Sequence, residues 1–261
     1  MGKTFVSVLL DESGSMESVR DQVIDGFNEY ISGLVGSGIK RIRVSLTKFD
    51  SSGFNPDYVG AKLKNVPELT RKSYCPNAMT PLYDAVGRMI RALEQQIAND
   101  SIKQGDKVLV VIQTDGLENA SKEYTQKAIK KLLKEKQKAG WTFVFLGADQ
   151  NAWGGASDLG VTMSNTFAYR SLDTQQIWAN QMVTSTTNYA IGAEGSAVNF
   201  FSKNSADEAL DSSGGTPNST ITFPTTTNDM PDVVPTTTTV PSPSLPERTV
   251  VTGADGEEIE V

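Results

Sequence analysis

Histidine is absent from this 261-residue sequence, and cysteine occurs once, as Cys75. Without histidine, the chain has neither Ser-His-Asp nor Cys-His activation of a nucleophile, and it has no imidazole ligand for zinc or iron. A single cysteine excludes an internal disulfide and a cysteine-rich zinc site, and it is typical of a reducing compartment. Any metal ion would therefore need oxygen ligands, which indicates Mg²⁺, Mn²⁺ or Ca²⁺.

Long hydrophobic runs are missing as well. No stretch approaches the roughly 18 apolar residues needed to cross a bilayer. The first residues carry one Lys before a strand-like run that ends at Asp11, which is not the pattern of a signal peptide. We therefore expect a cytoplasmic protein without a membrane partner.

Residues 1–204 lack a charge excess, since 23 Lys and Arg stand against 21 Asp and Glu. Nucleic acid is therefore not an expected partner. Residues 205–261 hold one Arg against 10 acids, and seven of the 11 prolines lie between 217 and 246. Such a segment buries too little apolar surface to offset its ordering entropy. We predict one domain over 1–204 and a disordered, acidic Thr/Pro-rich tail over 205–261, interpreted as a solubilising tail or a docking segment.

Apolar runs alternate with amphipathic stretches along the first two hundred residues. Continuous apolar runs are typical of parallel strands buried on both faces, whereas alternating ones are typical of an edge hairpin. The pattern predicts a doubly wound α/β fold, with a mostly parallel central sheet, one antiparallel edge strand and flanking helices. The predicted strands are 4–10, 107–113, 141–147, 41–49 and 58–66. The predicted helices are 19–34, 82–97, 122–139, a short one capped by Asp149, and 172–190.

Oxygen-bearing side chains cluster at the ends of these predicted elements. Asp11, Ser13 and Ser15 follow the first strand in "DESGSM", Asp115 follows another strand in "TDGLEN", and Thr80 precedes a helix in "MTPLYDA". In an open α/β sheet, ligands bind outside the carboxyl ends of the strands. Two carboxylates and three hydroxyls suit Mg²⁺ or Mn²⁺ and leave the ion able to attract a further anion. The predicted chemistry is a cation that captures a carboxylate of a protein partner.

These motifs resemble the metal-ion-dependent adhesion site of von Willebrand factor A domains, with its Asp-x-Ser-x-Ser, distant Thr and distant strand-end Asp. The resemblance covers about residues 1–200 and is closest to an intracellular bacterial and phage group with "TDGLENAS" and "GWTFVFLGA". One departure is Ala78, where this group often has glycine. The resemblance implies a Mg²⁺- or Mn²⁺-dependent protein-binding module that is not an enzyme. The metal ligands that it implies are Asp11, Ser13, Ser15, Thr80 and Asp115.

Other interpretations stay open. The Asp and Ser residues after the first strand could cap a helix, and a metal-free A domain would keep the same fold. A structural phage or virion protein could use the fold as a scaffold. A Mg²⁺-dependent phosphatase would need an acid two residues after Asp11, where Ser13 stands. The acidic end, Glu257 to Val261, could also reach the metal of its own or a neighbouring chain and cause self-association.

Overall fold

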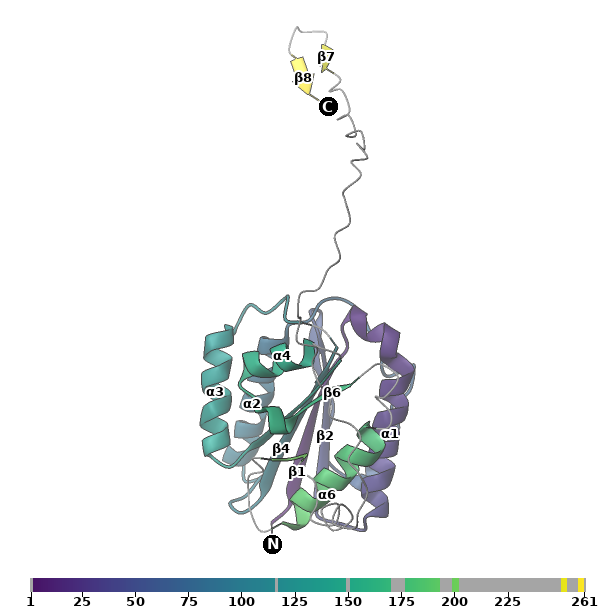
Figure 1. Cartoon of the computed structure of the whole chain (residues 1–261), viewed down its shortest axis with the longest axis vertical. Helices are drawn as coiled ribbons and strands as arrows, with labels where there is room; N and C mark the ends of the chain where they lie inside the picture. Colours follow the sequence, from purple (N-terminus) through teal and green to yellow (C-terminus); the bar gives the residue numbers. More distant parts are fainter. Residues whose placement is uncertain are drawn as a thin grey trace, which may run out of the picture. The chain divides into compact units, whose positions relative to one another are not determined.

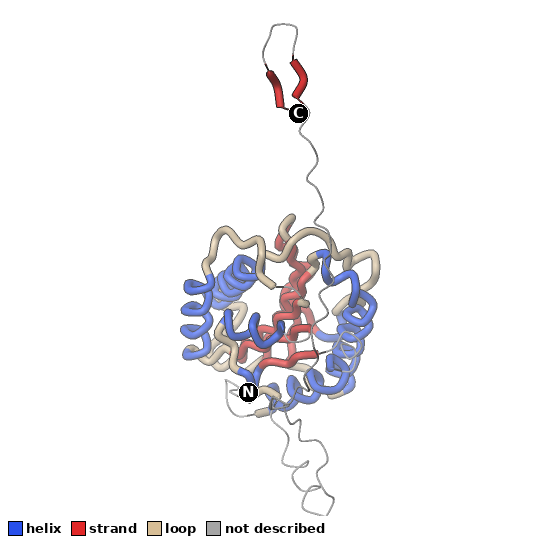
Figure 2. Tube along the Cα trace, turned by 45° about the horizontal axis from the view of Figure 1, so that its top comes forward, coloured by secondary structure: helices blue, strands red, loops and turns tan. Residues whose placement is uncertain are grey.

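The computed structural model describes residues 2–115, 117–148, 151–169, 177–192, 199–201, 250–252 and 258–260. The chain divides into two compact units, Met1–Ser212 and Ser213–Val261. The first unit contains a six-stranded sheet between two layers of helices (Figures 1 and 2). Among the described residues, no helix has both the length and the apolar character needed to cross a membrane.

The sheet has the strand order β3-β2-β1-β4-β5-β6. Its strands are β1 (Thr4–Asp11), β2 (Ile42–Asp50), β3 (Gly53–Lys62), β4 (Lys107–Thr114), β5 (Thr142–Ala148) and β6 (Thr166–Tyr169). Only the edge strand β3 runs antiparallel to its neighbour, and all other pairs in this sheet are parallel. The predicted fold class, doubly wound and mostly parallel with one antiparallel edge strand, is therefore confirmed.

The central strand β1 explains why the sheet is covered on both faces. All eight of its residues are buried. Because side chains alternate along a strand, Val6, Val8 and Leu10 join one hydrophobic core, while Phe5 and Leu9 join the other. The first core includes α1 (Arg20–Gly36), η5 (Ile177–Met182) and α6 (Val183–Ile191). The second includes α2 (Leu82–Ala98), α3 (Gln126–Lys138) and α4 (Asn151–Leu159).

Three predicted boundaries were wrong. Strand β3 ends at Lys62 and not at 66, because Leu63–Asn65 form a short 3-10 turn. The other two differences have reasons that the structure makes plain. Strand β3 begins at Gly53 and not at 58, because Asp50 accepts hydrogen bonds from the main-chain N–H of Ser52 (2.7 Å) and Gly53 (2.9 Å) and closes a tight turn. Helix α3 begins at Gln126 and not at 122. The carboxylate of Asp84 accepts the main-chain N–H groups of 122–124 and holds them in a loop.

The remaining differences concern short elements. Strand β6 was not predicted, and the last predicted helix is described from Ile177, as a π-helical turn that continues into α6. Short 3-10 turns also occur as η1 (Gly14–Val19), η2 (Leu63–Asn65) and η3 (Met163–Asn165). Helix α4 is present, but Asp149, its predicted cap, lies outside the described residues.

The second unit contains an antiparallel pair of short strands, β7 (Val250–Thr252) and β8 (Glu258–Glu260). These strands were not predicted. The predicted disorder over 205–261 otherwise falls on residues outside those that the structure describes.

Candidate metal centre

The predicted ligands lie at the carboxyl edge of the sheet, where the strand order changes direction. Asp11 is the last residue of β1 and Thr114 is the last residue of β4, and these two strands are parallel neighbours. Strands β2 and β4 lie on opposite sides of β1, so the crevice at this edge is the topological switch point of the fold. The loops after β1 and β4 therefore carry their side chains into the same region.

Asp11 forms the base of the site. Its side chain is fully buried, with Oδ1 accepting the main-chain N–H of Ser13 at 2.7 Å and Oδ2 accepting the Thr114 hydroxyl at 2.5 Å. No described Lys or Arg forms an ion pair with this carboxylate. Burial raises the pKa of the Asp11 carboxyl from 3.8 to about 6, although the hydrogen bonds from Thr114 and Ser13 lower it.

A chain of hydroxyl contacts leads from this buried carboxylate towards solvent. The hydroxyls of Ser13 and Ser15 are 3.3 Å apart, and Ser15 donates a 2.7 Å hydrogen bond to Oδ1 of Asp115. Ser13 is buried, Asp115 is half-buried and Ser15 is exposed. Burial also raises the pKa of Asp115, against the effect of the hydrogen bond from Ser15. The four side chains thus span from the sheet edge to the surface.

Thr80 is brought to the same edge by its loop. The N–H of Gly14 donates to the carbonyl of Ala78 (3.0 Å), and the N–H of Asn77 donates to the carbonyl of Glu12 (2.7 Å). These bonds join the loop before α2 to the loop after β1. The Thr80 side chain is buried, and its main-chain N–H donates to Oδ1 of Asn119 at 2.9 Å. Thr80 is therefore held between the loops that carry the other four residues.

Ala78 has a positive φ of 61°, in the left-handed region that favours glycine. This is the position at which the resembling group often has glycine. The alanine adopts this conformation at the cost of steric strain, so we expect the departure to lower the stability of the loop.

Three residues that hold the site were missed by sequence reasoning. Thr114 fixes one oxygen of Asp11, the hydroxyl of Tyr74 donates to the Asp11 carbonyl at 2.7 Å, and Asn119 binds the main chain of Thr80. Thr114 offered a signal, because it immediately precedes the strand-end Asp115. Tyr74 and Asn119 act through contacts that no local pattern indicates.

The donor set fits a hard divalent cation. Two carboxylates balance the charge of Mg²⁺ or Mn²⁺, and three hydroxyls supply neutral oxygens of the kind these ions accept. Among the described residues there is no group of three or more Asp, Glu, Cys or His. The five predicted ligands include only two acids, so they do not meet this criterion. Their role as metal ligands stays a prediction.

Comparisons with known proteins identify the fold. The sequence matches no family model and no curated protein. The structure is similar to the open conformation of the pilus adhesin SpaC from Lactobacillus rhamnosus GG, at 15% identity and a TM-score of 0.57, over 73% of this chain and 30% of that chain. The chain therefore spans about a third of that adhesin.

Two further solved structures show the same likeness. The von Willebrand factor domain of the type V pili tip protein Mfa5 from Porphyromonas gingivalis has 11% identity and a TM-score of 0.53, covering 74% of this chain and 98% of that one. Proximal thread matrix protein 1 from the mussel byssus has 13% identity and a TM-score of 0.51, covering 68% and 46%. The chain therefore has a von Willebrand factor A-like fold.

Proposed function

We propose that this chain is a protein-interaction module that holds Mg²⁺ or Mn²⁺ with Asp11, Ser13, Ser15, Thr80 and Asp115 and thereby captures an acidic residue of a partner. The observation that carries this proposal is the buried carboxylate of Asp11, which has no ion pair with any described Lys or Arg. An ionised carboxylate buried without a cation costs several kcal/mol. A bound divalent cation would offset that cost, and we infer that Ser13, Ser15, Thr80 and Asp115 would supply its further oxygen ligands.

The protein's own residues prepare the site for this task. Thr114 and the Ser13 N–H hold the two Asp11 oxygens in fixed positions, so little ordering is needed when a cation arrives. A bound cation would supply the positive charge that attracts a carboxylate from outside. The exposed Ser15 lies on the side from which such a ligand would approach.

Apolar side chains next to the site offer additional contact area. Met79, which precedes Thr80, is 56% exposed, and Leu117, two residues after Asp115, is 52% exposed. Interfaces commonly combine apolar contact area with a few polar contacts that fix the partner. We infer that Met79 and Leu117 would pack against the partner around its acidic residue.

The proposal does not include catalysis. Ser13 occupies the position where an aspartate-based phosphatase would need its general acid. The main-chain N–H of Ser13 donates a hydrogen bond to the carboxylate of Asp11. The cytoplasmic location and the relation to the phage group stay predictions of the sequence.

Calorimetric titration with Mn²⁺ tests the metal site. We expect wild type to bind one ion and Asp115→Asn to lose this binding, because that change removes one of only two charged ligands. Asp50→Asn is the matched control, since Asp50 also ends a strand at this edge but accepts hydrogen bonds from its own turn. Absence of Mn²⁺ binding by wild type, or equal binding by all three proteins, would refute the metal site.

Carboxylate capture needs a separate measurement. Water bound to Mn²⁺ relaxes solvent protons, so the relaxation enhancement of the Mn²⁺-loaded protein should fall when a glutamate-containing peptide displaces that water. A glutamine-containing peptide is the control. If the relaxation enhancement is the same with both peptides, the metal site does not capture carboxylates. If the protein instead hydrolyses p-nitrophenyl phosphate and Asp11→Asn loses this activity, the protein is a phosphatase.

A further inference from the structure

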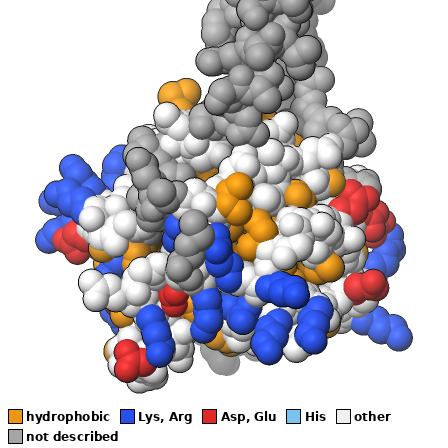
Figure 3. All heavy atoms as spheres, turned by 90° about the horizontal axis from the view of Figure 1, so that it is seen from below, with side chains coloured by type: hydrophobic (Ala, Val, Ile, Leu, Met, Phe, Trp, Pro, Cys, Tyr) orange, Lys and Arg blue, Asp and Glu red, His pale blue; other side chains and the backbone are white. Residues whose placement is uncertain are grey.

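A second candidate site lies at the opposite, amino edge of the sheet. A hollow of about 520 Å³ is enclosed by the end of α1, the loop after it, the start of β2, the end of β3 and η2. Figure 3 views this lower face of the molecule and shows many Lys and Arg side chains with few acids among them. Phe5 pairs with Arg43, which lines the hollow, and it lies six residue steps before Asp11 on β1, so about 20 Å of strand separates the two sites.

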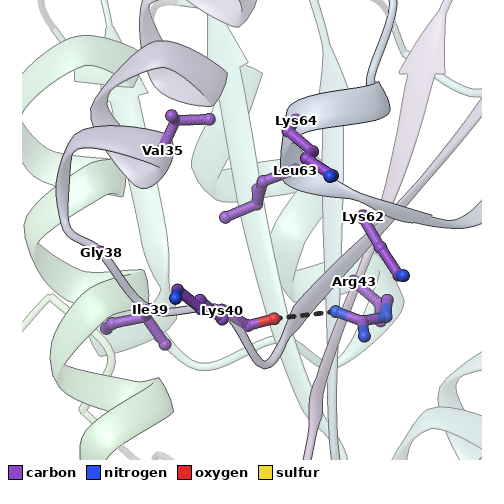
Figure 4. Close-up of a pocket in the computed structure, with 8 residues that line it drawn as sticks. All are labelled: Val35, Gly38, Ile39, Lys40, Arg43, Lys62, Leu63 and Lys64. Carbon is purple, nitrogen blue, oxygen red and sulfur yellow. Dashed lines mark hydrogen bonds between the residues drawn. The ribbon is translucent and has the colours of Figure 1, made fainter.

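Four cationic residues line the hollow: Lys40, Lys64 and the neighbouring pair Arg43 and Lys62 (Figure 4). No Asp or Glu lines it, and none of these four forms an ion pair with a described acid. The residues that line the hollow therefore carry four positive charges and no negative one, which favours an anionic ligand.

The pairing of β2 with β3 strengthens this conclusion. Arg43 and Lys62 are direct partners in the antiparallel register, so their side chains stand beside each other on one face of the sheet. Like charges placed directly opposite each other destabilise a strand pair. The Arg43 guanidinium is also held in place, since its Nη1 donates to the carbonyls of Lys40 (3.0 Å) and Ile42 (2.9 Å). An acidic ligand would reduce the repulsion between the Arg43 and Lys62 side chains.

The rest of the lining is apolar. Val35, Ile39 and Leu63 contribute aliphatic side chains from three different elements (Figure 4). No aromatic side chain lines the hollow, so there is no surface on which a nucleotide base could stack. Cations around an aliphatic lining match a ligand that has several carboxylates beside a branched aliphatic side chain.

We propose that this hollow binds an acidic peptide segment carrying a branched aliphatic side chain. The segment "DGEEIE" at 255–260 of this chain has that composition, with four acids and Ile259 among six residues. A peptide of its sequence is therefore the natural probe. The site is independent of the metal centre, because it lies at the other edge of the sheet and needs no cation.

The test is the binding of a fluorescently labelled peptide of residues 253–261, followed by anisotropy in EDTA at low ionic strength. EDTA removes any metal, so the peptide cannot bind through the metal centre. The host is the full chain carrying Glu257→Gln, Glu258→Gln and Glu260→Gln, so that its own acids do not compete. We expect saturable binding that weakens as salt is added, because the attraction depends on exposed charges.

Charge reversal at the hollow should remove this binding. Lys62→Glu with Lys64→Glu should weaken the affinity about ten-fold or more. The matched control is Lys127→Glu with Lys134→Glu, which reverses two exposed lysines of α3 that do not line the hollow and should leave binding unchanged. Lys62→Glu turns a repulsive pair with Arg43 into an attractive one, so the variant should fold at least as stably as wild type.

The aliphatic lining is tested by the peptide itself. Replacing its isoleucine with asparagine should weaken binding without changing the charge. Absence of peptide binding in EDTA, or the same loss in both double variants, would overturn the proposal. So would displacement of the peptide by inorganic phosphate or ATP at concentrations where acetate has no effect, because the hollow would then be a phosphate site.

Discussion

Replacing Asp11 with asparagine should make the metal-free protein more stable at pH 7 and abolish its stabilisation by Mg²⁺. Asparagine has the shape of the buried carboxylate but no charge. Its carbonyl oxygen can accept the N–H of Ser13, and its amide can donate to the Thr114 hydroxyl, so both contacts of Asp11 are retained in altered form. The substitution therefore isolates the effect of the charge.

The magnitude follows from the pKa of Asp11, which burial raises from 3.8 to about 6. Because the folded state holds the proton more tightly than the unfolded state, this group's favourable contribution is complete below pH 4 and is lost as the pH rises through 6. At pH 7 the ionised side chain costs the metal-free protein about 3 kcal/mol. Asparagine avoids this cost at every pH, so a gain of up to about 3 kcal/mol in the free energy of unfolding is expected.

Urea unfolding in EDTA and in excess MgCl₂ measures both effects. Wild type should gain about 2.7 kcal/mol when free Mg²⁺ is a hundred times its dissociation constant, whereas Asp11→Asn should gain nothing. Asp50→Asn is again the control. Its carboxylate accepts three hydrogen bonds within its own turn, so its loss should cost about 1 kcal/mol and leave the response to Mg²⁺ intact.

One outcome would refute this reasoning directly. If metal-free Asp11→Asn is less stable than wild type by 1 kcal/mol or more (a difference of the size expected for a lost cap), the carboxylate is a net stabilising cap of the loop after β1. An equal gain from Mg²⁺ in both proteins would place the ion elsewhere.

Two further predictions concern the same edge of the sheet. Metal affinity should fall on acidification, because the cation binds only the ionised Asp11, whose pKa is about 6. Calorimetry should show about ten-fold weaker Mn²⁺ binding at pH 5 than at pH 7. An affinity that is constant over this range would exclude Asp11 as a ligand. Ala78→Gly should raise the free energy of unfolding by about 0.5–1 kcal/mol in urea, because alanine at a φ of 61° is strained and glycine is not, and a loss of stability would contradict that account of the loop.

The sequence by itself determined five of the six strands of the sheet and the residue types of the candidate site. Continuous apolar runs are incompatible with an exposed strand, so β1, β4 and β5 could be placed closely from hydrophobicity alone. The absence of histidine and the single cysteine restricted any metal site to oxygen ligands. The predicted start of α3 was wrong because a distant carboxylate decides it, since Asp84 holds residues 122–124 out of the helix.

Only the tertiary structure decided what surrounds Asp11. Its burial, its bond to Thr114 and its lack of an ion pair with a described Lys or Arg depend on which strand lies beside β1, and that neighbour is more than ninety residues away in the chain. Spacing can match a family pattern, but it does not reveal whether a carboxylate is solvated or isolated.

The basic hollow at the other edge shows the same limit more sharply. The turn pairs Asp50 with Gly53, and an unbroken register would place Gly60 opposite Arg43. Two register shifts along β2 and β3 bring Lys62 there instead. Local sequence specifies side chains and their periodicity, whereas the pairing of strands decides which charges meet, because hydrogen bonding between strands is set by the packing of the whole sheet.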